Sequence, residues 1–221
     1  CKRIMSFILH IETATKICSV ALSENGKLVN EKTEYGDGYI HGERLTLLIQ
    51  KVMSEKNINF SSLAAISISI GPGSYTGLRI GLSTVKGIAF ALKCPIIPLN
   101  TLEIMAKSIR YNGNIFAMLD ARRMEVYAYG INEEKNAIFS PAPLILDAES
   151  LSEFDPFLCL GDGAFKVKNI WSHRNVEFLD EFQINAGLQV ELAFERFKNK
   201  DFATASTLVP DYLKEFQTTS S

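Results

Sequence analysis

Apolar and polar positions alternate along the first hundred residues in a pattern that predicts strands and amphipathic helices. Three short runs, residues 7–12, 17–23 and 27–33, are predicted as an antiparallel meander, with Glu24-Asn25-Gly26 as a hairpin turn. Two further strands are expected at residues 65–70 and 96–99, each preceded by a helical pattern. This order predicts an α/β fold in which helices pack on a mixed sheet.

Helical spacing of apolar residues predicts two helices, over residues 41–56 and 78–92. The first carries one inward row, Leu45, Leu48, Ile49 and Val52. The second carries an inward row, Leu78, Leu82, Val85, Ala89 and Leu92, and also a second face of small or aliphatic residues, Ile80, Gly81, Thr84, Gly87, Ile88 and Ala91. Either helix 41–56 covers this second face or a partner subunit does. Ile40 and Leu47, outside the inward row, would extend such an interface.

The second half repeats the beginning of the chain in a shortened form. Strands are predicted at 115–120, 125–131 and 157–160, with turns at Ala121-Arg122-Arg123 and Gly161-Asp162-Gly163 and helices at 164–170 and 185–199. Two lobes follow, residues 5–110 and 111–221, with Met5 as the expected start of the chain proper.

Composition narrows the class of protein. Hydrophobic residues make up 47% of the chain and charged residues 22%, as in an ordinary folded protein. A net charge of -2 excludes a global positive field for nucleic acid or anionic membrane. Four cysteines without a C-x-x-C pair, and no apolar run long enough to span a bilayer, predict a reduced, cytoplasmic setting with no membrane association.

Groups that could carry catalysis are few. The three histidines have no partner histidine at i+3 or i+4, and no Cys or carboxylate cluster has zinc-site spacing, so no metal is expected. The loop over residues 71–77 is rich in glycine, but Leu78 and Arg79 follow Gly77 where a phosphate-binding loop has Lys and then Ser or Thr. A tight turn that lets strand and helix pack closely is the favoured interpretation. The basic residues Arg122, Arg123, Lys166 and Lys168 are too dispersed to indicate a nucleic-acid site.

Several segments together resemble the TsaB (YeaZ) family of tRNA threonylcarbamoyladenosine biosynthesis proteins. The most specific is Gly71-Pro72-Gly73-Ser74-Tyr75-Thr76-Gly77-Leu78-Arg79-Ile80-Gly81; others are Ile8 to Thr15, Asp120-Ala121-Arg122-Arg123, Gly161-Asp162-Gly163-Ala164 and Pro210-Asp211-Tyr212-Leu213. The resemblance implies an actin and Hsp70-like ATPase fold (ribonuclease H-like), with two related lobes of which the second is degenerate. The family is in turn related to the TsaD, glycoprotease-like (peptidase M22) family.

The resemblance also implies a role without catalysis. A relative of this type, together with a TsaE-type ATPase, binds and supports the TsaD-type subunit. The TsaD-type subunit transfers threonylcarbamoyl to the adenosine next to the tRNA anticodon. Contact with tRNA would then be indirect, and the chain alone would form a homodimer. The expected partner interface comprises Ile40, His41, Arg44, Leu47, Ile80, Gly81, Thr84, Gly87, Ile88 and Ala91. A TsaD-type metal site, held by a His-x-x-x-His pair, cannot form because Leu45 stands four residues after His41.

Nucleotide chemistry is expected to be weak in this chain. Active members of the fold follow the acidic residue of each phosphate turn closely with Gly, whereas this chain has Glu12-Thr13-Ala14 and Asp120-Ala121-Arg122, whose Cβ atoms crowd a phosphate. No cofactor is required, and at most weak ATP or ADP binding is expected, in a cleft formed by Glu12, Thr13, Ala14, Thr15, Asp120, Gly161 and Gly163. The alternative is an ATP-dependent kinase of the same fold, with Glu12 and Asp120 as the carboxylates that could activate a substrate hydroxyl. A glycoprotease is a third class, and the missing metal pair argues against it.

Overall fold

The computed structural model describes residues 6–36 and 40–213. The expected start at Met5 lies outside the described residues. The chain divides into two compact units: unit 1 consists of Cys1–Ile104 and Ile184–Pro210, and unit 2 consists of Met105–Gln183 and Asp211–Ser221. Among the described helices, none is long and apolar enough to cross a membrane.

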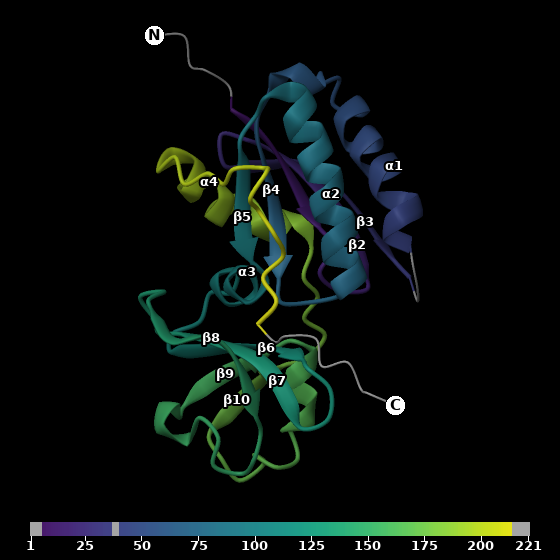
Figure 1. The fold of residues 1–221 in the computed structure, drawn as a ribbon. Helices are drawn as coiled ribbons and strands as arrows, with labels where there is room; N and C mark the ends of the chain where they lie inside the picture. Colours follow the sequence, from purple (N-terminus) through teal and green to yellow (C-terminus); the bar gives the residue numbers. More distant parts are fainter. Residues whose placement is uncertain (1–5, 37–39, 214–221) are drawn as a thin grey trace, which may run out of the picture. The chain divides into compact units, whose positions relative to one another are not determined.

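Unit 1 is built on a five-stranded mixed sheet with the order β3-β2-β1-β4-β5 (Figure 1). Its strands are β1 (Phe7–Glu12), β2 (Ile17–Glu24), β3 (Lys27–Tyr35), β4 (Leu63–Gly71) and β5 (Ile96–Asn100). β1, β2 and β3 form the predicted antiparallel meander, whereas β4 and β5 run parallel to β1. The β2–β3 turn places Asn25 and Gly26 at φ angles of 51° and 76°, the left-handed geometry that two-residue hairpins require.

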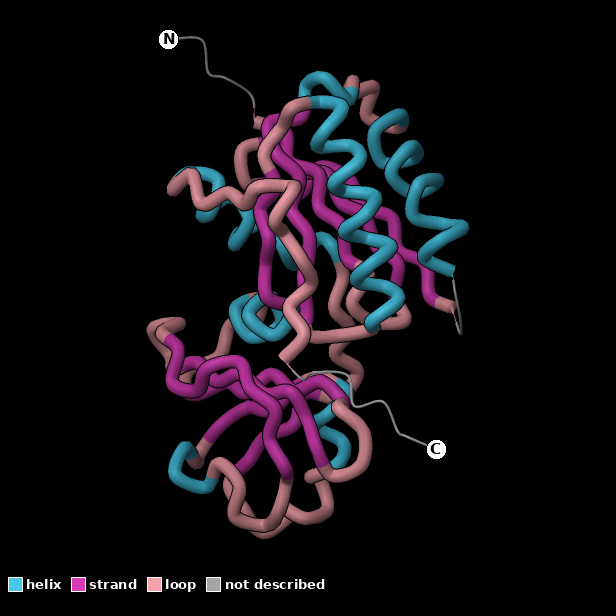
Figure 2. The backbone as a smooth tube through the Cα atoms, in the orientation of Figure 1, coloured by secondary structure: helices cyan, strands magenta, loops and turns pink. Residues whose placement is uncertain are grey.

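One face of this sheet is covered by two long helices, α1 (Ile40–Ser54) and α2 (Tyr75–Leu92), which lie side by side (Figure 2). Their inward rows are buried as predicted, apart from a half-buried Leu92. α2 begins three residues earlier than predicted because the Ser74 side chain caps it, accepting a hydrogen bond from the Gly77 amide at 3.2 Å. Two shorter elements, the 3-10 helix η1 (Phe60–Ser62) and the helix α3 (Thr101–Lys107), were not predicted.

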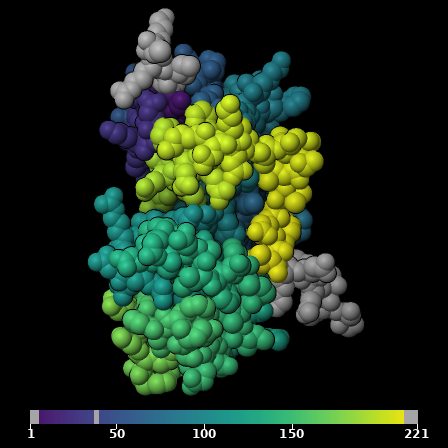
Figure 3. All heavy atoms as spheres, turned by 90° about the vertical axis from the view of Figure 1, so that its left-hand side faces the viewer, coloured from purple at the N-terminus to yellow at the C-terminus, as the bar shows by residue number. Residues whose placement is uncertain are grey.

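The other face of the sheet is covered by residues from the C-terminal part of the chain. Figure 3 shows the C-terminal part of the chain, in yellow, on the outer surface of the molecule. They form the 3-10 helix η4 (Ala186–Gln189) and the helix α4 (Val190–Lys198), where a single helix over 185–199 was predicted. The Ser19 side chain accepts a hydrogen bond from the Ala186 amide at 3.0 Å, and Gln189 is fully buried. The predicted lobe 111–221 is therefore corrected: residues 184–210 belong to unit 1, because buried polar contacts with the first sheet hold them there.

Unit 2 repeats the sheet topology of unit 1, with the order β10-β9-β6-β7-β8. Its strands are β6 (Asn114–Asp120), β7 (Glu125–Ile131), β8 (Ala137–Ile145), β9 (Phe157–Leu160) and β10 (Val176–Leu179). β6, β7 and β8 are antiparallel neighbours, and β9 and β10 run parallel to β6, as β4 and β5 run parallel to β1. The predicted internal repeat is confirmed. Unit 2 is smaller because two short 3-10 helices, η2 (Ser152–Phe154) and η3 (Asp162–Lys166), occupy the positions that the long helices have in unit 1. η3 and the turns after it replace the helix predicted at 164–170.

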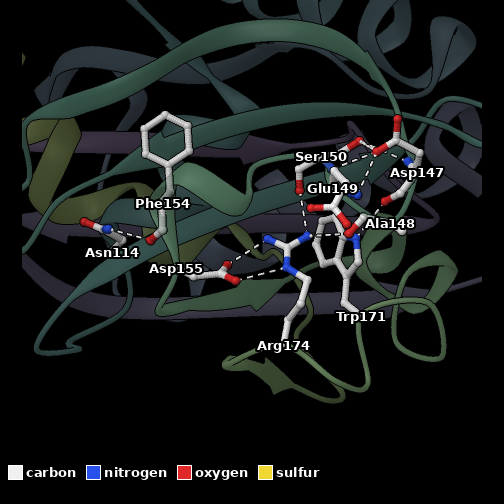
Figure 4. Close-up of polar contacts among 9 residues, drawn as sticks. All are labelled: Asn114, Asp147, Ala148, Glu149, Ser150, Phe154, Asp155, Trp171 and Arg174. Atoms are coloured by element: carbon white, nitrogen blue, oxygen red, sulfur yellow. Dashed lines mark hydrogen bonds and ion pairs between the residues drawn. The ribbon is translucent and has the colours of Figure 1, made fainter.

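A buried arginine holds several segments of unit 2 together (Figure 4). The Arg174 side chain is 6% exposed and binds both carboxylate oxygens of Asp155, at 2.7 and 3.0 Å. Its Nη1 also donates to the backbone carbonyls of Ala148 and Ser150, and its guanidinium lies 4.5 Å from the centre of the Trp171 ring. One side chain thus fixes the loop between β8 and β9 on the core of unit 2.

Candidate functional site

The second face of α2 is open over its C-terminal half. Beyond the adjoining backbone of α2 itself, a Cβ built on Gly87 meets no described atom within 4 Å, and Ala91, one turn further, is exposed. Ile80, Thr84 and Ile88 are half-buried at the side of this face. These residues are the part of the expected interface that lies on α2 and is accessible in the structure.

α1 covers only the first part of this face. A Cβ on Gly42, in the first turn of α1, would lie 4.0 Å from the Ile80 side chain. Ile40, Ile80 and Ile88 pack against the edge of the unit 1 core. Leu47 points away from that core and is 44% exposed, as its position outside the inward row predicts. Of the two explanations for the second face, intramolecular cover thus accounts for the beginning of α2.

Two residues of the expected interface are inside unit 1 and need correction. His41 is buried, and its Nε2 donates to the Thr15 carbonyl oxygen at 2.9 Å, which fixes the start of α1 on the β1–β2 turn. Gly81 is buried because α2 approaches that turn: a Cβ at Gly81 would lie 2.3 Å from Thr13 Oγ1. Both residues support the surface from below and do not form it.

Arg44 is on the surface but is already paired. Its Nε and Nη2 donate to the two carboxylate oxygens of Glu34 on β3, at 2.5 and 2.9 Å. Hydrogen bonding by Arg44 lowers the pKa of Glu34. A partner that used Arg44 would have to share it with Glu34 or displace Glu34.

Phe90 is a surface residue that belongs to neither of the two apolar rows predicted for α2. Its side chain is 85% exposed, the highest value among the exposed large apolar residues of the described chain. Because it lies three residues after Gly87 and next to Ala91, it borders the open face. A large aromatic side chain in water beside small residues is typical of a contact surface and could have been noticed from the sequence.

The β1–β2 turn, where the fold would hold a phosphate, is occupied by its own chain. Glu12 is fully buried, and its carboxylate accepts hydrogen bonds from the Ala14 amide at 2.8 Å and the Ser69 hydroxyl at 2.7 Å. Gln189 Nε2 lies 3.3 Å from the other carboxylate oxygen. Burial raises the pKa of Glu12, while the Thr13 and Ala14 amides act in the opposite direction. The turn amides thus bind the chain's own carboxylate.

The glycine-rich loop brings α2 directly against this turn, as the tight-turn interpretation predicts. The Ser74 amide donates to the Ala14 carbonyl oxygen at 2.6 Å. A Cβ at Gly73 would lie 2.4 Å from that oxygen, and a Cβ at Gly77 would lie 2.1 Å from the Thr13 carbonyl oxygen. These distances are too short for any Cβ, so the close packing of α2 on this turn requires glycine at both positions.

A buried hydrogen-bond chain supports Glu12 from behind. Ser67 donates to Gln189 Oε1 at 2.7 Å, so the Ser67 oxygen accepts from His10 Nδ1, also at 2.7 Å. His10 Nε2 must then accept from the Ser23 hydroxyl at 2.7 Å, which makes the ring a neutral Nδ1–H tautomer. Burial lowers the pKa of His10 to about 3, in agreement with a neutral ring.

The corresponding turn of unit 2 is also held by internal contacts. Asp120 accepts hydrogen bonds from Lys166 Nζ at 2.6 Å and from the Arg122 amide at 2.5 Å. Burial alone would raise the pKa of Asp120, but these two donors hold it below its ordinary value. The Asp120 amide donates to Asp162, whose own pKa is raised by burial. Both acidic side chains of this turn thus make contacts within unit 2.

Gly161 packs on β6, and Gly163 packs on both β6 and β7. A Cβ at Gly161 would lie 2.2 Å from the Met118 carbonyl oxygen, and one at Gly163 would lie 2.8 Å from the Val126 side chain. The predicted nucleotide residues therefore fall into two groups, Glu12 to Thr15 in unit 1 and Asp120, Gly161 and Gly163 in unit 2. Within each unit, the structure brings the members of the group together, and nucleotide binding by them stays a prediction.

Curated proteins of one description resemble this chain over most of its length. The tRNA threonylcarbamoyladenosine biosynthesis protein TsaB of Bacillus subtilis is 31% identical over 217 residues, covering 94% of this chain and 93% of that protein. The protein of the same description from Haemophilus influenzae is 28% identical over 223 residues, with the same coverage. A family model described as TsaD, tRNA N6-adenosine threonylcarbamoyltransferase, matches residues 38–144.

Solved structures agree with these similarities. YeaZ from Pseudomonas aeruginosa superposes with a TM-score of 0.80 at 26% identity, covering 95% of this chain and all of that chain. The ethanolamine utilization protein EutJ from Carboxydothermus hydrogenoformans has a TM-score of 0.54 at 10% identity and covers 85% of this chain and 90% of that chain, which bears on the fold alone. The predicted actin-like ATPase fold is confirmed.

Proposed function

Because the chain belongs to the TsaB family and so takes part in tRNA threonylcarbamoyladenosine biosynthesis, we propose that it acts there as a non-catalytic subunit. In this role it binds and supports the TsaD-type subunit that performs the transfer. A TsaE-type ATPase joins the complex, and tRNA is reached through the partner. The open face of α2 is the observation that carries the proposal.

The open face has the character of a protein interface. Gly87 and Ala91 leave the backbone of α2 accessible, so another helix can approach closely there. Phe90 and Leu47 supply apolar area that stays in water in the isolated chain. In a two-fold dimer the same patch of each copy meets the other, so this surface is also the proposed contact of a homodimer that the chain forms without its partner.

The two turns support the absence of catalysis. Phosphoryl transfer needs backbone donors and cations that face the nucleotide, together with a carboxylate that can take a proton. In unit 1, Glu12 binds the Ala14 amide and is fully buried. In unit 2, Asp120 is paired with Lys166. Both candidate carboxylates of the kinase alternative are thus engaged within their own units.

Reconstitution with the TsaD-type and TsaE-type proteins of the same organism tests the proposal. Transfer of threonylcarbamoyl to tRNA is measured with and without this chain, and phosphate release from ATP and magnesium is measured with this chain alone. We expect transfer to depend on the chain, and no phosphate release above background without its partners. Transfer that is unchanged when the chain is omitted would contradict the supporting role. ATP turnover by the isolated chain, with a substrate hydroxyl phosphorylated, would favour the kinase.

A further inference from the structure

A pocket of about 520 Å³ opens in unit 1 at the end of α4. Its floor is where the parallel strands begin, near Pro95 before β5 and Ala64 at the start of β4. The β1–β2 turn lies after the opposite, carboxyl ends of these strands. The pocket is also separate from the open face of α2, because α4 and α2 cover opposite faces of the sheet (Figure 1). It therefore belongs to neither of the sites described above.

Three phenylalanines form the aromatic part of the pocket lining: Phe194, Phe197 and Phe202. Phe197 and Phe202 have ring centroids 5.9 Å apart and planes tilted by 54°. Phe194 rests on the β2–β3 hairpin, where a Cβ at Gly26 would lie 2.4 Å from its ring. Aromatic side chains in this number offer ring faces and edges to a flat apolar ligand.

Internal contacts hold the segment that carries Phe197 and Phe202. Arg196 binds Asp201 at 2.5 Å, and the Asp201 amide donates back to the Arg196 carbonyl oxygen at 3.0 Å. The Ala203 amide then donates to the Ile96 carbonyl oxygen at 2.9 Å, which ties the segment after Phe202 to β5. A pocket whose lining is held in this way loses little entropy on binding.

Two lysines of the lining, Lys198 and Lys200, bring positive charge to this apolar site. Lys198 Nζ lies 5.3 Å from the centre of the Phe194 ring. Among the described residues, neither lysine forms an ion pair, and the nearby Asp201 carboxylate is bound to Arg196. The charge of the two ammonium groups is thus available to a ligand.

We propose that this pocket binds a small aromatic anion, with its ring against the phenylalanines and its acidic group at Lys198 and Lys200. The volume is within the range of small-molecule sites, which are mostly apolar with a few placed polar groups. The two ammonium groups distinguish an anion from a neutral ring of the same shape. The proposal goes beyond the role in tRNA modification and does not depend on it.

The test uses the whole chain and 8-anilinonaphthalene-1-sulfonate, an aromatic sulfonate whose fluorescence rises in an apolar site. N-phenyl-1-naphthylamine, which has the same rings and no charge, is titrated in parallel. We expect saturable binding of the sulfonate at one site. The neutral probe should bind roughly fivefold more weakly or worse, because it gains nothing from the ammonium groups.

Two variants locate the site. The double charge reversal Lys198→Glu, Lys200→Glu should weaken sulfonate binding by about tenfold or more and leave the neutral probe unchanged. Ala64→Leu places a larger side chain in the pocket and should abolish binding of both probes. The matched control is Lys51→Glu, Lys56→Glu, two exposed positions on and just after α1 with the same change in net charge, and it should bind the sulfonate as the parent does. Thermal unfolding of each variant shows that it is folded.

Three results would overturn the proposal. Binding that is equal for the charged and neutral probes removes the role of the lysines. Equal weakening by the two double reversals shows that only net charge matters. Loss of binding in Phe90→Ser, with Ala64→Leu unaffected, places the probe on the open face of α2 and not in the pocket.

Discussion

At the scale of single residues, two glycines of the same helix have opposite roles. A Cβ at Gly77 would lie 2.1 Å from a backbone oxygen of the β1–β2 turn, whereas a Cβ at Gly87 meets no described atom within 4 Å. Gly77→Ala should therefore lower the free energy of unfolding by about 3 kcal/mol or more, because neither backbone can move away. Gly87→Ala should raise it by about 0.5–1 kcal/mol, because alanine is the better helix former.

Urea unfolding of the two alanine variants, monitored by circular dichroism, checks this pair. Each is the control for the other, since both replace a glycine of α2 with the same residue. Equal changes in the unfolding midpoint would show that the close approach at the turn is not what requires glycine.

His10 makes stability depend on pH. Burial lowers its pKa from 6.5 to about 3, so the unfolded chain binds the proton more tightly than the folded chain does. The contribution of neutral His10 to the free energy of unfolding is therefore fully present above pH 6.5 and is lost as the pH falls toward 3. Between pH 7.5 and pH 5 the free energy of unfolding of the parent should fall by about 2 kcal/mol more than that of His10→Gln, because the variant has no titrating group at this position.

Unfolding free energies at several pH values in this range, for parent and variant, supply the measurement. His41 has a lowered pKa and Glu12 a raised one, but both residues are present in the two proteins, so their contributions cancel in the difference. Parallel pH profiles would mean that His10 is not the buried neutral group that its hydrogen bonds indicate.

At the scale of elements, Arg174 joins segments that are distant in sequence within unit 2. Arg174→Met should lower the free energy of unfolding by about 3 kcal/mol. The substitution leaves the partly buried Asp155 carboxylate and the two loop carbonyls without their hydrogen-bond donor. Trp171, the single tryptophan of the chain, reports the change through its fluorescence during unfolding. In a double-mutant cycle with Asp155→Asn, the two costs should not be additive, and additive costs would contradict a direct ion pair.

The pattern of apolar residues predicted most strands and the two long helices, because burial on a sheet imposes clear periods. It failed where other forces decide. β8 carries Pro141 and Pro143 and is partly exposed at a sheet edge, so it lacks a strand-like apolar pattern. The residues at 184–210 were assigned to the wrong unit, because their contacts with unit 1, such as Gln189 with Ser67, join positions more than a hundred residues apart.

Of the candidate site, only the part that depends on the spacing of residues along one helix could be predicted from the sequence. The helical period identified the second face of α2, including Gly87 and Ala91. It could not show that His41 turns inward to the Thr15 carbonyl, because a loop contact has no period. It also could not show that Glu12 faces its own turn amides and not a ligand.

At the scale of the whole molecule, the two units share one topology and differ in what covers the sheet. Unit 1 has two long helices on one face, and α2 keeps part of its surface uncovered by described residues. This open face is the proposed contact with a TsaD-type partner.

Binding of that partner to Gly87→Arg tests the claim most directly. Titration over the immobilised partner compares the affinities of four proteins: the parent, Gly87→Arg, Gly87→Ala and Ser61→Arg. Ser61→Arg is the control, because Ser61 is exposed in η1 and the substitution changes the net charge by the same amount as Gly87→Arg. Each variant is first shown to be folded by circular dichroism. Our account predicts that Gly87→Arg loses binding, by roughly a hundredfold or more, while Ser61→Arg binds like the parent and Gly87→Ala falls between them. Parent-like binding by folded Gly87→Arg would contradict it.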